Sequence, residues 1–257
     1  MLTQRLYITI ILCLLCFSVV SAQSGPVPDA DSAITIALAY TGFSDTRNFS
    51  SDKMLQARRA QVMQDTLSPQ LHRLINGRAA WMVEFRDITM KRNSSDTTLY
   101  GPDNWNGRVY IDAQTGQLLK IVCWNPQTSG PDDNRWSNIR LRMPTISNVE
   151  PGLTSGPTPG TFRDALIFEP NFWVPAPQRV EGYLLNFARL SDDSGRSPES
   201  SETKLLWYLL MEDVNVHAFR PERGIVPLVA YRCFDPFART LGGCGGVASG
   251  KPVEEIE

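Results

Sequence analysis

Residues 108–119 read RVYIDAQTGQLL, and this stretch predicts the fold of its part of the chain. Two β-rich runs, at 108–112 and 117–123, flank a short turn. Gly116 can adopt the left-handed conformation that a tight turn needs, and Asp112 can accept backbone hydrogen bonds where the turn begins. We therefore expect an antiparallel hairpin here.

A further strand is predicted upstream of this hairpin. After the turn signal Asn-Gly at 76–77, the segment WMVEFR at 81–86 broadly alternates between apolar and polar residues. Trp81 begins the apolar face, which predicts a half-buried strand. Glu84 and Arg86 lie on the other face, where they form either a solvated surface or a binding surface.

The rest of the chain combines helical and strand-like patterns. Apolar residues recur at helical spacing in three places, the first of which stops at Gly42. We expect helices at residues 31–41, 51–63 and 177–190, and further strands at residues 205–216 and 226–234.

The second half of the chain partly echoes the first. Trp207 is followed by Asp235 at nearly the separation that divides Trp81 from Asp112, and each aspartate ends a β-rich run. Either the chain contains a duplicated strand–loop–hairpin unit, or two β-rich stretches resemble each other by chance.

The N-terminus is typical of an export signal. Residues 1–22 combine Arg5, an apolar run and a small-residue cleavage site, so we expect a secreted or periplasmic, cell-envelope protein. An uncleaved membrane anchor is the alternative, and no membrane contact is expected after cleavage. The expected organisation is a signal peptide (1–22), a first domain (23–124), a Pro/Gly-rich linker (125–160) and a second domain (161–257).

Composition and motifs argue against several functional classes. The 257 residues include 25 Lys and Arg, 27 Asp and Glu and two histidines, so a nucleic-acid surface or a multi-histidine metal site is not expected. No G-x-S-x-G, H-E-x-x-H or P-loop pattern occurs. The segment DNWNG at 103–107 lacks the flanking acids of a calcium loop. We therefore predict no catalytic residues, cofactor or metal.

Three cysteines follow the signal segment, and an oxidising compartment favours one disulfide among them. Cys233 and Cys244 are the candidate pair, with the glycine-rich segment 242–246 expected to be a flexible turn. Cys123 is the alternative partner of either. Catalysis by Cys244 with His217 as base is a much weaker reading, because no cysteine-protease signature surrounds it.

The first half resembles the PepSY family. The resemblance rests on the helix at 33–39, the strand at 81–85 and above all the phrase VYIDAQTGQLL at 109–119; it spans roughly residues 31–123, with a degenerate second copy at about 161–245. It implies an α+β fold, a helix packed on a small antiparallel sheet (PepSY/cystatin-like), here duplicated. The signature positions, which the family explains as core and turn residues, are Trp81, Tyr110, Asp112 and Gly116, with Trp207 and Asp235 in the second copy.

The resemblance also implies a function. PepSY domains occur in propeptides of secreted metalloproteases and in exported bacterial proteins, so we expect a non-catalytic protein that regulates or inhibits an exported peptidase by stoichiometric binding. An extended peptide segment would add to an edge of the sheet. The alternative is a structural or adhesive envelope module that binds glycan or a surface protein, a class in which exposed tryptophans mark the binding surface. The tryptophans near expected loops are Trp105, Trp124, Trp136 and Trp173.

Overall fold

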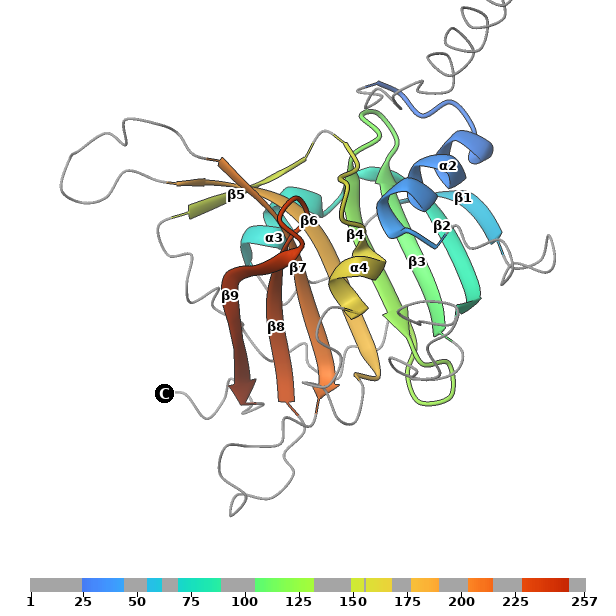
Figure 1. The fold of residues 1–257 in the computed structure, drawn as a ribbon. Coiled ribbons are helices and arrows are strands. Elements are labelled where there is room, and N and C mark those ends of the chain that lie inside the picture. The colour runs from blue at the N-terminus through green and yellow to red at the C-terminus, as the bar shows by residue number, and fades with distance from the viewer. Residues whose placement is uncertain are drawn as a thin grey trace, which may run out of the picture.

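A computed structural model describes nine segments of the chain, and their strands form one antiparallel sheet (Figure 1). The described residues are 25–43, 55–61, 69–88, 105–131, 149–154, 156–167, 177–189, 203–214 and 228–249. The predicted signal segment lies outside them. None of the described helices is long and apolar enough to cross a membrane.

The nine strands follow the order β1-β2-β3-β4-β6-β7-β8-β9 across the sheet, and β5 pairs with β6 off this path. The strands are β1 (Leu55–Gln61), β2 (Ala79–Ile88), β3 (Trp105–Asp112), β4 (Leu118–Trp124), β5 (Val149–Leu153), β6 (Arg179–Arg189), β7 (Thr203–Val214), β8 (Leu228–Asp235) and β9 (Thr240–Ser249). The helices are α2 (Ala30–Thr41), α3 (Pro69–Ile75) and α4 (Phe162–Ile167).

Helix α2 confirms the first predicted helix. The Asp29 carboxylate accepts a hydrogen bond from Ser32 N at 2.8 Å and so caps the N-terminus. Gly42 ends the helix with φ 70°, and its N–H donates to Leu38 O at 3.0 Å. The helix buries Ala33, Ala37 and Tyr40 against the sheet.

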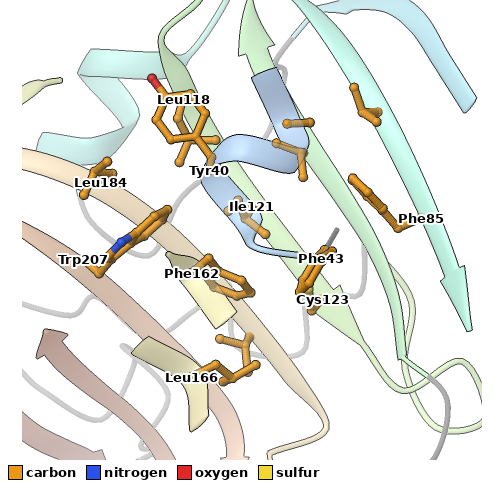
Figure 2. Packing of buried hydrophobic residues seen from close by; sticks show 14 of the residues in the cluster. Tyr40, Phe43, Phe85, Leu118, Ile121, Cys123, Phe162, Leu166, Leu184 and Trp207 are labelled. Atoms are coloured by element: carbon orange, nitrogen blue, oxygen red, sulfur yellow. The ribbon is translucent and has the colours of Figure 1, made fainter. Parts of the chain in front are cut away.

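Two apolar clusters lie on opposite faces of the sheet. The first packs α2 and α4 on one face, and Figure 2 shows Phe162 of α4 beside Trp207 and near Phe43. The second lies beneath α3, with Leu71 and Ile75 fully buried. Successive strand residues point to opposite faces, and a cluster covers each face, so a strand in the middle of the sheet buries side chains on both sides.

Burial on both faces corrects the half-buried reading of β2. Trp81, Val83 and Phe85 face the first cluster, as expected, but Met82 is buried in the second. The face of β2 that carries Met82 opens to solvent only toward the C-terminal end of the strand. There the exposed Arg86 pairs with Glu84 at 3.0 Å.

Two predicted helices are wrong. The segment expected as a helix at 51–63 contains β1, and the one expected at 177–190 contains β6. In β6, apolar side chains fill both faces, so the apolar residues fit a helical period and a buried strand equally well. Gly182 decides between them: a Cβ there would lie 2.4 Å from the Phe162 ring, so this glycine lets α4 approach the strand closely.

Several elements were not anticipated. Helix α3 begins at Pro69, a favourable first residue, and the turn predicted at Asn76-Gly77 follows this helix and leads into β2. Helix α4 and strand β5 were also missed, the latter inside the expected linker. The glycine-rich segment at 242–246 is not a flexible turn, since it lies within β9.

The sheet is larger than the small sheet expected, and it spans both predicted domains. β4 pairs with β6 along four residues, from Ile121 opposite Gly182 to Trp124 opposite Arg179. The hairpin predicted at 108–123 is confirmed as β3 and β4, and the strands predicted at 205–216 and 226–234 as β7 and β8. The fold is thus α+β, dominated by one antiparallel sheet.

Candidate functional site

The signature tryptophans hold corresponding positions in the two halves. Trp81 Nε1 donates to Val27 O at 3.0 Å, and Trp207 Nε1 donates to Gly160 O at 2.8 Å. Each acceptor precedes the N-terminus of the helix that covers its own half, α2 or α4. A buried indole N–H needs a partner, so each hydrogen bond fixes a helix over its sheet.

The signature aspartates open equivalent turns. Asp112 Oδ1 accepts from Gln114 N (2.8 Å) and Thr115 N (3.0 Å), and the Asp112 carbonyl accepts from Gly116 N (2.9 Å). Asp235 Oδ1 accepts from Phe237 N and Ala238 N, both at 2.9 Å. These side chains shape turns that join the third and fourth strands of each half.

Burial and hydrogen bonding act in opposite directions on Asp112. Burial raises the pKa of this carboxyl, but the backbone N–H groups of Gln114 and Thr115 outweigh it, helped by Arg78 at 3.0 Å, so the pKa lies below its ordinary value. The carboxylate therefore stays ionised and keeps the turn closed.

Tyr110 and the cysteines lie within the sheet. Tyr110 is buried in the second cluster and pairs with Lys120 across β3 and β4. Cys123 is a free, buried thiol, and burial raises its pKa. Cys233 is buried in β8 and disulfide-bonded. The side chain of Cys244 lies outside the described residues, so the Cys233–Cys244 bridge stays a prediction.

A buried ionic cluster, which the sequence analysis did not single out, joins the two halves. Glu181 Oε1 lies 2.8 Å from Lys120 Nζ and 2.5 Å from Arg179 Nη2, and Tyr183 OH donates to Glu181 Oε2 at 2.6 Å. Lys120 belongs to β4, whereas the other three belong to β6. The signal was present as charged residues within otherwise apolar segments, but the pairing of β4 with β6 could not be read from the sequence.

The electrostatics of this cluster favour a structural role. Burial alone raises the pKa of Glu181, but the charges of Lys120 and Arg179 outweigh it and lower the pKa to about 2. The Lys120 side chain is fully buried and that of Glu181 is 4% exposed, so neither meets solvent. Both Glu181 carboxylate oxygens have partners, so separating β4 from β6 would leave a buried charge uncompensated.

The edges of the sheet differ in chemistry. β1 forms one edge and carries the exposed Arg58 and Arg59; the Arg59 guanidinium lies 4.1 Å from the centre of the Trp81 ring. β9 forms the other edge and reads TLGGCGGVAS, with no charged residue and no proline. Within the described residues, no further strand pairs with the outer side of either edge. Charges protect an edge from pairing, so β9 is the more receptive of the two.

An exposed aromatic residue lies at the start of this receptive edge. Phe237, in the turn between β8 and β9, is 64% exposed, and among the described residues it is the exposed large hydrophobic side chain. Beside it, Arg239 Nη2 donates to Pro159 O at 3.2 Å. Aromatic residues and arginine are enriched at protein–protein interfaces relative to the rest of the surface.

The other candidate positions add no site within the described chain. Trp105 and Trp124, expected near loops, are buried residues at the ends of β3 and β4. Residues 105–107 of the segment DNWNG belong to β3. No group of three or more His, Cys, Asp or Glu among the described residues could hold a metal ion. Trp136, Trp173 and His217 lie outside the described residues.

No protein-family model, no curated protein and no solved structure matches this chain.

Proposed function

We propose that this chain is an exported, non-catalytic binding protein that regulates a peptidase by stoichiometric binding. In this proposal the chain contains two PepSY/cystatin-like units, a helix with four antiparallel strands in each. The first comprises α2 with β1 to β4, and the second α4 with β6 to β9. The support is the equivalent placement of Trp81 and Trp207, and of Asp112 and Asp235, beside the hairpin phrase at 109–119.

The observation that carries the proposal is the β9 edge. An extended segment of a partner gains main-chain hydrogen bonds by adding to an unpaired strand, and side chains flanking that strand give specificity. β9 offers ten residues without charge or proline, and Phe237 lies in the turn that leads into it. Stoichiometric binding follows, because one edge accepts one strand.

The test is a titration of purified residues 23–257 into the secreted proteolytic activity of the source organism. We expect activity to fall linearly to an end point near one binding protein per peptidase. No loss across metalloprotease and serine-protease substrates would contradict regulation of a peptidase. Binding to isolated cell-surface glycan or a surface protein would then favour the envelope-module alternative.

Two neighbouring substitutions locate the binding edge. Alternate N–H groups of an edge strand point to opposite sides, and proline removes one N–H, so Gly245→Pro and Gly246→Pro affect different sides of β9. The variant that loses a hydrogen bond to β8 should melt at a lower temperature. The other should keep its melting temperature and lose inhibition. Full inhibition by the stable variant would contradict binding at this edge.

A further inference from the structure

The join between the two halves is itself a strand addition within one chain. β4, the last strand of the first half, pairs antiparallel with β6, the first strand of the second. At the ends of the sheet lie β1, which is the first strand of the first half, and β9, which is the last strand of the second. Among the described strands, one edge of each kind is therefore left without a neighbour.

The first strands of the two halves correspond residue by residue. Trp81 pairs with Arg59 of β1, and Trp207 pairs with Leu184 of β6. Since the two tryptophans hold equivalent positions, Arg59 corresponds to Leu184. Two residues earlier, Ala57 corresponds to Gly182.

The last strands correspond in the same way. Trp81 lies opposite Ile111 of β3, and Trp207 lies opposite Phe234 of β8. Two residues before these positions, Val109 pairs with Ile121 of β4 and Arg232 pairs with Gly245 of β9. Gly245 of β9 is therefore the counterpart of Ile121 of β4. The pair that joins the halves, Ile121 opposite Gly182, thus has free counterparts in Gly245 and Ala57.

We propose that β9 of one copy pairs antiparallel with β1 of a second copy, in the register by which β4 pairs with β6. Gly245 then lies opposite Ala57 of the second copy, and Gly246 lies opposite Gln56. Gly245, Gly246 and Ala57 are small, so at these positions no bulky side chain keeps the backbones from hydrogen-bonding distance. Arg58 and Arg59 make β1 a poor partner for a charged edge, but β9 carries no charged residue to repel them. The occupant is a second copy because the chain itself supplies both halves of a junction that it already forms once internally.

Such an interface is head-to-tail. Two different edges meet, so each added copy covers one edge and exposes another of the same kind, and one β1 edge and one β9 edge always remain at the ends. Assembly therefore continues beyond a dimer unless the rotation between copies closes a ring.

The junction between copies is weaker than the internal one. One residue before Gly245 and Ala57, the counterpart of Lys120 of β4 is Cys244, and the counterpart of Glu181 of β6 is Gln56. The main-chain hydrogen bonds are retained, but the buried ionic cluster is lost. Reversible, concentration-dependent association follows. This inference goes beyond the proposed function, and it implies that self-association covers the edge that would receive a peptidase segment.

Introduced cysteines test the register directly. Opposed residues of an antiparallel pair have Cα atoms about 4.5–5.5 Å apart, within reach of a disulfide. Residues 23–257 carrying Gly245→Cys and Ala57→Cys should form linked multimers larger than dimers under mild oxidation, with peptide mapping showing a link between the introduced thiols. The control, Gly245→Cys with Gln61→Cys, places the second cysteine four residues out of register and should give few disulfide-linked multimers.

Sedimentation of the unsubstituted protein completes the test. We expect the weight-average mass to rise with concentration past twice the monomer mass. A constant monomer mass with no linked multimers would overturn the proposal, and so would dimers linked through Gly245→Cys alone, which indicate β9 pairing with β9. Peptidase inhibition by a strictly monomeric protein would refute only the self-association. Self-association without inhibition would refute only the peptidase proposal.

Discussion

Gly116 and Arg239 occupy the same backbone position in the two halves of the sheet. Each is the fourth residue after a turn-opening aspartate and donates its N–H to that aspartate's carbonyl, at 2.9 and 2.8 Å. Their φ angles are 71° and 52°, both left-handed. Glycine adopts this conformation without a steric penalty, whereas an L-residue with a side chain costs roughly 1–2 kcal/mol.

The two turns should therefore respond oppositely to substitution. We expect Gly116→Ala to lower the free energy of unfolding by about 1 kcal/mol and Arg239→Gly to raise it by up to about 1 kcal/mol, less the loss of the Arg239–Pro159 hydrogen bond. Urea unfolding of residues 23–257 measures both. Equal effects of the same sign would show that the turns are not equivalent.

Gly42 and Gly77 separate backbone strain from crowding. Both have positive φ, 70° and 75°. A Cβ on Gly77 meets nothing within 4 Å, but a Cβ on Gly42 would lie 2.4 Å from Thr161 Oγ1. Gly77→Ala should cost about 1 kcal/mol, and Gly42→Ala distinctly more, because α2 must move away from α4. Thr161→Ala should recover part of the difference in thermal or urea unfolding, and no recovery would contradict the contact.

Gly182 and Phe162 form a second pair of this kind. We expect Gly182→Ala to destabilise by about 1–3 kcal/mol through overpacking against the Phe162 ring. In a double-mutant cycle, Phe162→Leu should make the alanine less costly, with a coupling of about 0.5–3 kcal/mol. Additive effects would show that the alanine methyl does not meet the ring.

These glycines also show why sequence reasoning found some elements of the fold and missed others. The hairpin at 108–123 depends on local chemistry, an aspartate that accepts nearby N–H groups and a glycine that turns left-handed, and the sequence displays both. In β6, the decisive fact is the ring of Phe162 above Gly182, a contact between residues twenty positions apart. Periodicity carries no information about such a contact.

The edge strands were missed for a related reason. β1 reads LQARRAQ, which favours a helix by propensity, but its pairing with β2 from Leu55 opposite Phe85 to Gln61 opposite Ala79 overrides this. β9 has four glycines and suggests a turn, yet pairing with β8 holds it extended. The candidate binding edge is therefore invisible in the sequence, while the signature residues Trp81 and Asp112 are not.

The buried cluster makes stability depend on pH in the acid range. Glu181 has a pKa of about 2 in the folded chain against an ordinary 4.5, so the unfolded chain takes up a proton first as pH falls. This contribution is present above about pH 4.5, is lost toward pH 2, and is on the order of 3 kcal/mol. Glu181→Gln should flatten the fall in unfolding free energy over that window.

The same substitution has an effect at neutral pH. Without the carboxylate, Lys120 and Arg179 remain buried near each other, so Glu181→Gln should destabilise by about 3–5 kcal/mol. Glu84 and Asp112 also have lowered pKa values, but both remain in the variant and cancel in the comparison. If the free energy of unfolding fell equally steeply with pH in the unsubstituted chain and in Glu181→Gln, the role assigned to Glu181 would be contradicted.

The three cysteines that follow the predicted signal segment should react very differently with a thiol reagent. Cys123 is fully buried, and burial raises its pKa, so the folded chain should not be labelled there. In denaturant without reductant, we expect one thiol in residues 23–257, because Cys233 is disulfide-bonded. Mass mapping should then place Cys244 in the bridge: Arg232 pairs with Gly245 and Phe234 with Leu241, which brings the backbones of Cys233 and Cys244 together. Three thiols in denaturant, or a bridge to Cys123, would refute this pairing.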